Sequence, residues 1–165
     1  MGMGQSLFTI LSMMLLVTLA TRINTNILSA QDTSQNSKFG LAAISLATSK
    51  IEEASRLFFD ESSVDSALTT VATLTEVNLL GPEPDEISED LYDDVDDYNG
   101  YQLIDSTQLS AVYKVKIAVT YLNEADLNKI GTAKSWHKQI KVSVSSPMMR
   151  DTINFASIFS YWTFR

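Results

Sequence analysis

No charged side chain occurs before Arg22, and the segment that precedes it is almost continuously apolar. Large apolar residues dominate residues 7–19, and no proline interrupts them. A helix of about 20 such residues is long enough to cross the ~30 Å hydrocarbon layer of a membrane. The rest of the chain contains no second run of this kind. We therefore expect a single apolar stem helix followed by a water-soluble body.

The bulk composition limits what this body can be. A length of 165 residues leaves room for one modest hydrophobic core after the stem. The absence of cysteine excludes disulfides, thiolate metal sites and a thiol nucleophile within this chain. The net charge of −8 is unevenly distributed, because no Lys or Arg occurs between Arg56 and Lys114. We expect no nucleic-acid partner, since phosphate binding needs a basic face.

The helical pattern weakens after the stem and then returns. Residues 21–38 are rich in Asn, Thr, Ser and Gln, whose side chains compete with helical hydrogen bonds, so they predict a weak helix or a melted hinge. Apolar residues recur at helical spacing in residues 39–59. The predicted buried face of this second helical part comprises Leu41, Ile44, Ala47, Ile51, Ala54 and Phe58. We accordingly divide the chain into a stem with a polar hinge, residues 1–38, and a head, residues 39–165.

Alternating apolar and polar residues predict antiparallel strands near the C-terminus. Residues 113–121 and 136–144 alternate clearly, and residues 152–162 form a third candidate strand with Phe155, Phe159 and Tyr161 on one face. Residues 123–132 are expected to connect the first two strands. The predicted fold class is therefore α+β, in which a long N-terminal helix packs on a small C-terminal antiparallel sheet.

An acidic segment at residues 85–100 separates the helical part from the strands, and we expect it to be a surface excursion. Carboxylate and amide oxygens are ligands that Ca²⁺ accepts. The residues that could supply them are Asp93, Asp94, Asp96, Asp97 and Asn99. Their spacing departs from that of an EF-hand loop, because Asn99 stands where such a loop needs glycine.

Two other interpretations of the acidic segment stay open, and no metal ligand set is assigned. It could be a solvated loop, or it could contact basic strand residues of its own or a neighbouring subunit. The basic residues concerned are Lys114, Lys116, Lys138 and Lys141.

This plan resembles that of type IV pilins and pseudopilins. The segment from Gly4 to Leu11 is similar to the region around a prepilin cleavage site, and residues 92–100 resemble the acidic motif of minor pilins of the mannose-sensitive haemagglutinin type. The resemblance implies a pilin-like fold and a structural subunit of an extracellular type IV pilus-like filament on the cell surface. Such a subunit is stored in the inner membrane, and pilus assembly machinery builds it into a helical filament of identical subunits.

The resemblance makes the stem the assembly element of the chain. The residues that it implies are Met1, Gln5, Leu7, Phe8, Leu11, Leu15, Leu16 and Leu19. No basic leader precedes the stem, so we expect Met1 to be the mature first residue, the alternative being a leader that ends at Gly4. Pilins usually carry Glu at mature position five. Gln5 departs from that pattern, and its amide cannot form an ion pair with a neighbour's terminal amine.

Other functions remain as alternatives. The chain could be a pseudopilin of a secretion system, or a single-pass membrane-anchored extracytoplasmic binding domain. Catalysis is not expected, because the sequence has a single histidine, no cysteine and no glycine-rich phosphate loop. The only cofactor considered is Ca²⁺ at the acidic segment.

Overall fold

A computed structural model of the chain describes residues 2–64, 66–106 and 111–164. It begins with the helix α1, Met3–Ala54, which is 52 residues long. The polar residues 21–38 are helical throughout, so the expectation of a melted hinge is wrong and the weak-helix alternative agrees with the structure. Threonine hydroxyls here donate to carbonyls of the preceding turn, as Thr25 Oγ1 does to Arg22 O at 2.9 Å. These bonds lie within the helix, so they do not interrupt it.

The chain forms two compact units, Met1–Lys38 and Phe39–Arg165. In the first unit, residues 2–35 are exposed along their whole length. An 18-residue window of α1 near the N-terminus has a mean hydropathy of 1.8, and none of it is buried. By length and composition, this helix could cross a membrane.

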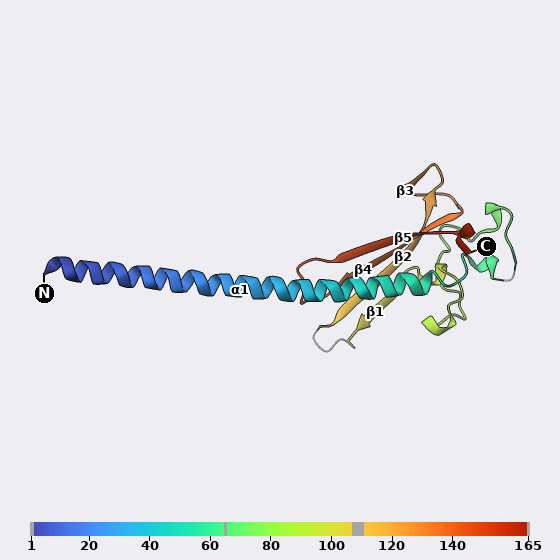
Figure 1. Cartoon of the computed structure of the whole chain (residues 1–165). Coiled ribbons are helices and arrows are strands. Elements are labelled where there is room, and N and C mark those ends of the chain that lie inside the picture. Colours follow the sequence, from blue (N-terminus) through green and yellow to red (C-terminus); the bar gives the residue numbers. More distant parts are fainter. Residues whose placement is uncertain (1, 65, 107–110, 165) are drawn as a thin grey trace. The chain divides into compact units, whose positions relative to one another are not determined.

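The second unit contains a five-stranded antiparallel sheet (Figure 1). Four strands follow the order β1-β2-β4-β5, and β3 pairs with β2. The strands are β1 (Gln102–Asp105), β2 (Tyr113–Asn123), β3 (Asp126–Ile130), β4 (His137–Ser145) and β5 (Ile153–Ser160).

The three strands predicted from alternation are confirmed as β2, β4 and β5, and the fold class is α+β as expected. The sequence pattern missed β1 and β3, which are short and do not alternate clearly. The strand β3 occupies part of the predicted connection at residues 123–132. It pairs with the end of β2 through an irregular register at Leu122 and Asn123, and such a polar hairpin gives little hydrophobic alternation to detect.

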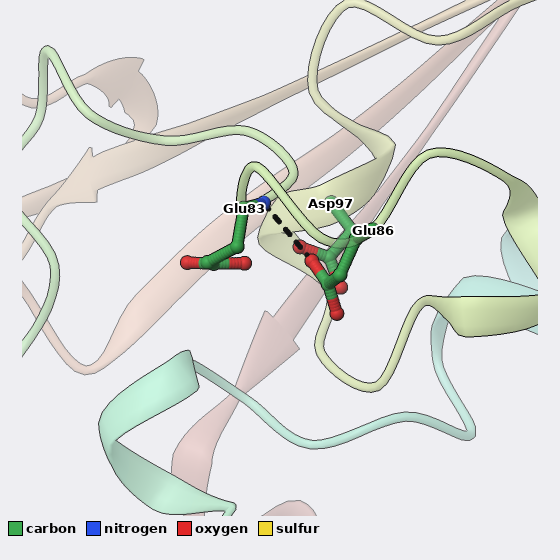
Figure 2. A group of neighbouring side chains, drawn as sticks. All are labelled: Glu83, Glu86 and Asp97. Carbon is green, nitrogen blue, oxygen red and sulfur yellow. Dashed lines mark hydrogen bonds between the residues drawn. The ribbon is translucent and has the colours of Figure 1, made fainter.

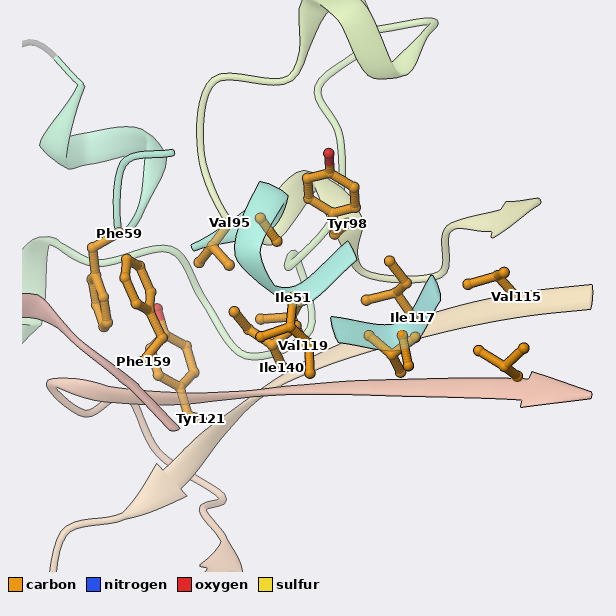
Figure 3. Packing of buried hydrophobic residues seen from close by; sticks show 14 of the residues in the cluster. Ile51, Phe59, Val95, Tyr98, Val115, Ile117, Val119, Tyr121, Ile140 and Phe159 are labelled. Atoms are coloured by element: carbon orange, nitrogen blue, oxygen red, sulfur yellow. The ribbon is translucent and has the colours of Figure 1, made fainter. Parts of the chain in front are cut away.

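The head core lies between the last turns of α1 and one face of the sheet (Figure 3). The buried helix residues are Ala43, Ala47, Ile51 and Ala54. The sheet residues they share a core with include Tyr113, Val115, Ile117, Val119, Tyr121, Ile140, Val142 and Val144. Small alanine side chains let a helix backbone approach a sheet closely.

The predicted helix face is therefore wrong at three positions. Leu41, Ile44 and Phe58 are exposed by 69 %, 40 % and 50 %. Leu41 and Ile44 are not among the buried helix residues, and Phe58 lies beyond the end of the helix. The helix also ends at Ala54, five residues before the predicted end. Beyond it, Phe58 forms a parallel bridge with Asp94.

Candidate functional site

The stem presents the side chains that the pilin resemblance assigns to assembly. Gln5 is exposed, and the apolar members of the set, Leu7, Phe8, Leu11, Leu15, Leu16 and Leu19, have exposed fractions from 54 % to 74 %. Met1 lies outside the described residues. A helix that is apolar on all sides needs lipid or protein around it, because water alone gives it no place to bury these side chains.

Gln5 differs from the other polar residues of the stem. The hydroxyls of Ser6, Thr9, Ser12, Thr18 and Thr21 all donate to carbonyls of their own helix, at 2.7 to 3.0 Å. The Gln5 backbone N–H donates to Gly2 O at 2.9 Å, but its side-chain amide forms no hydrogen bond with the residues that the structure describes. Its donors and acceptor therefore remain available to a neighbouring chain.

The acidic segment is only partly the surface excursion that was expected. Most of residues 85–91 are exposed, but residues 94–98 are buried, and Asp94, Asp96 and Asp97 are only 1–2 % exposed. The segment is attached to the chain that follows α1 by two backbone hydrogen bonds, Phe58 N–H to Asp93 O at 3.0 Å and Val95 N–H to Phe58 O at 2.9 Å. The expectation is wrong for residues 94–98 because these aspartates have partners inside the head.

The main partner is Lys138, which is fully buried in β4. Its ammonium lies 2.8 Å from Asp60 Oδ2 and 2.6 Å from Asp96 Oδ1. It also donates to Phe59 O at 2.7 Å, and it lies 4.5 Å from the centre of the Phe59 ring. Tyr121 donates to Asp60 Oδ2 at 3.0 Å. A buried cation with two carboxylates and a carbonyl is well compensated.

The Lys138–Asp96 ion pair thus joins one of the four basic residues named from the sequence to one residue of the acidic segment. The other three, Lys114, Lys116 and Lys141, are exposed on the sheet. Asp60 was not anticipated from the sequence. Alternation could have placed Lys138 inside, because it shares strand parity with Trp136 and Ile140.

The remaining candidates of the segment mostly hold the loop in place. Asp94 Oδ1 accepts from the backbone N–H groups of Asp96 and Asp97. Asp97 Oδ2 accepts from those of Asp93 and Asp94, and both of these bonds are 3.1 Å long. Asn99 joins two other parts of the head. Its Nδ2 donates to Leu80 O at 2.9 Å, and its Oδ1 accepts from Val119 N–H at 3.1 Å.

A cluster of aromatic rings and one ion pair supports the same loop. Tyr98 contacts Tyr92 and Tyr101 edge to face, with ring centres 5.3 and 5.6 Å apart. The hydroxyls of Tyr98 and Tyr101 both donate to Glu89, which also pairs with Lys50 of α1. These tyrosines anchor the loop to the helix, so their role within the head is structural.

Three carboxylates meet on the other side of the loop. Oxygens from Glu83, Glu86 and Asp97 all lie within 4.8 Å of one another (Figure 2). Glu86 Oε2 accepts from Glu83 N–H at 3.0 Å. Among the residues that the structure describes, no Lys, Arg or His side chain pairs with any of the three. Glu83 and Glu86 were not anticipated as site residues, because Glu83 lies in the proline-rich turn, residues 81–84, and Glu86 precedes the aspartates considered for Ca²⁺.

The electrostatics differ between the two sides. Burial opposes ionisation of Asp60, but the Lys138 ammonium and hydrogen bonds from Thr75 and Tyr121 outweigh it and lower its pKa. Burial raises the pKa of Glu83 to about 8 and that of Asp97 to about 6, and neighbouring carboxylates add to both. Burial, with Asp96 and Asp97 nearby, raises the pKa of Asp94 to about 9. Burial also raises the pKa of Asp96 to about 7, although Lys138 opposes this, so the cation outweighs burial at Asp60 but not at Asp96.

The five residues considered for Ca²⁺ from the sequence therefore do not form one ligand set. Asp96 pairs with Lys138, Asn99 bonds to backbone partners, and Asp97 groups with Glu83 and Glu86.

Comparison with known proteins returns no match: no family model, no curated protein and no solved structure matches this chain.

Proposed function

We propose that this chain is a structural subunit of an extracellular type IV pilus-like filament that assembles through its N-terminal helix. The observation that carries the proposal is the exposure of the stem, whose large apolar side chains have no partner within their own unit. Lipid can cover them while the subunit is stored, and the stems of other subunits can cover them in a filament.

The head supports a structural role. It has one small core and a loop held in place by buried charges. Leu41 and Ile44 add exposed apolar surface on α1 beyond the stem. A single-pass anchor needs lipid contact only in the stem, whereas a packed filament would cover these two side chains as well.

Surface filaments provide the direct test. Cells that express the chain should yield sheared fibres visible by negative-stain microscopy, and mass spectrometry of those fibres should find this chain as the dominant protein. A chain that stays in the membrane fraction without fibres would replace the proposal with an anchored domain. Its presence only in a secretion complex would favour a pseudopilin.

Gln5 allows a sharper test of assembly. Gln5→Leu should lower fibre yield without lowering the amount of membrane-stored subunit, because it removes the stem amide that is not bonded within its own helix. Ser12→Ala is the matched control, since the Ser12 hydroxyl donates to Phe8 O of the same helix at 2.7 Å. Equal fibre yield from the Gln5→Leu chain and the native chain would remove Gln5 from the mechanism.

A further inference from the structure

The carboxylates of Glu83, Glu86 and Asp97 come from two segments that the head holds against each other. Glu83 and Glu86 lie in a turn, closed by the hydrogen bond from Glu86 N–H to Glu83 O at 3.0 Å. Asp97 belongs to the acidic loop, within a short 3₁₀ helix, Asp96–Tyr98. Asn99 ties the two segments together through its bond to Leu80 O. Their proximity is therefore part of the folded head.

Asp97 points into this group with an unsatisfied oxygen. The residue is 1 % exposed, and its Oδ1 is buried without a hydrogen-bond donor in the described part of the chain. Glu83 Oε2 is also buried without a hydrogen-bond donor in the described part of the chain. A buried carboxylate oxygen without a donor is costly, and two such oxygens beside a third carboxylate call for a positive charge among them.

We infer that Glu83, Glu86 and Asp97 bind a Ca²⁺ ion that fastens the proline-rich turn to the acidic loop. The three oxygens all lie within 4.8 Å of one another. Ligand distances of about 2.3–2.6 Å allow one Ca²⁺ ion to reach all of them. Hard carboxylate oxygens suit Ca²⁺, and water and backbone carbonyls complete its usual six to eight ligands.

The site differs from the motif that suggested calcium in the sequence. Only Asp97 is common to both, because it is the one residue of that motif whose carboxylate groups with Glu83 and Glu86. The inference is independent of filament assembly, since it concerns residues of one chain only. A subunit in detergent can bind Ca²⁺ whether or not it forms fibres, so the two proposals can fail separately.

The test uses the full chain in detergent, stripped with a chelator and titrated with CaCl₂ in a calorimeter. One Ca²⁺ should bind per chain, with a Kd on the order of 10⁻⁴ M as in extracellular sites, and MgCl₂ should bind at least about tenfold more weakly. Saturating Ca²⁺ should raise the thermal midpoint of the head by roughly 2–4 °C.

Glu83→Gln and Glu86→Gln should each weaken Ca²⁺ binding by about tenfold or more, since each removes a charged ligand but keeps an amide oxygen. Asp85→Asn is the matched control, because Asp85 is an exposed acid of the same turn; its Kd should equal that of the native chain. Heat capacity and Trp fluorescence in chelator verify that the variants fold. Three results would overturn the inference: no Ca²⁺ heat, equal loss in all variants, or no loss in either glutamine variant. The first would mean that a shared proton or a partner's cation neutralises the group.

Discussion

At the scale of single residues, Lys138 organises the head. It is the only cation that meets Asp60 and Asp96 in the described structure, and all three side chains are buried. Removing one member of such a group leaves uncompensated charge in the core, which costs far more than the group itself contributes to stability. The head has no disulfide to offset that loss.

Lys138→Met should destabilise the head by about 3–5 kcal/mol, because it keeps the volume but leaves two buried carboxylates without a cation. Urea unfolding in detergent, followed by the fluorescence of Trp136, measures the change. Lys141→Met is the control, since Lys141 is exposed on the same strand, and it should change stability by less than about 0.5 kcal/mol. Equal midpoints for the two variants would contradict this role of Lys138.

We expect the stability of the head to fall at low pH because of Asp60. Its folded pKa is lowered by Lys138, Thr75 and Tyr121 despite burial. Its contribution to stability is therefore present above the unfolded value of about 3.9 and is lost as the pH falls through the folded pKa. Urea midpoints between pH 7 and pH 3 should fall less steeply in Asp60→Asn than in the native chain. Parallel curves for the two chains would show that other carboxylates cause the acid sensitivity.

At the scale of elements, the acidic loop depends on one glycine. Gly100 ends the motif at φ +85°, and its N–H donates to Ile117 O at 3.1 Å. A side chain at this φ is strained, so the tight connection from the loop into β1 requires glycine. The turn therefore fixes where Asn99 and the tyrosines enter the head.

Gly100→Ala should cost about 1–2 kcal/mol of head stability, the usual penalty for a left-handed residue with a Cβ. Gly40→Ala is a matched control, because Gly40 is helical and a Cβ there meets nothing within 4 Å. That control should stabilise the chain by about 0.5–1 kcal/mol. Chemical denaturation of both variants checks the sign, and a neutral Gly100→Ala would contradict the requirement for glycine.

Features that depend on neighbouring residues in the sequence could be predicted, whereas contacts between distant segments could not. The strands β2 and β4 follow from local periodicity and were predicted with nearly correct bounds. The stem follows from its continuous apolar run, but the helix that contains it extends unbroken to Ala54. The burial of Asp96 could not be read locally, because Lys138 lies 42 residues away. A run of acids indicates solvent exposure only while no buried cation is known. The site at Glu83 was missed for the same reason, since its partner Asp97 lies in another segment.

At the scale of the whole molecule, the stem is the part that could cross a membrane by its length and composition. A charge at the centre of a spanning helix costs about 2.5–3.5 kcal/mol for insertion. Leu15→Asp should accordingly move the chain out of the membrane fraction and abolish surface fibres, as measured by fractionation and immunoblotting. Ser29→Asp is the control, because Ser29 lies in the polar part of α1, and it should leave membrane storage unchanged. Normal storage of the Leu15→Asp chain would exclude the stem as the membrane segment.

The position of Lys138 also sets an order of events during synthesis. The helix that contains the stem is complete at Ala54. Asp60 and Asp96, by contrast, gain their cation only when Lys138 is synthesised, 78 and 42 residues later. A growing chain can therefore enter the membrane before its head can fold. Any chain that stops before residue 138 would carry a finished stem and a head with unpaired carboxylates, which leaves that head open to proteolysis.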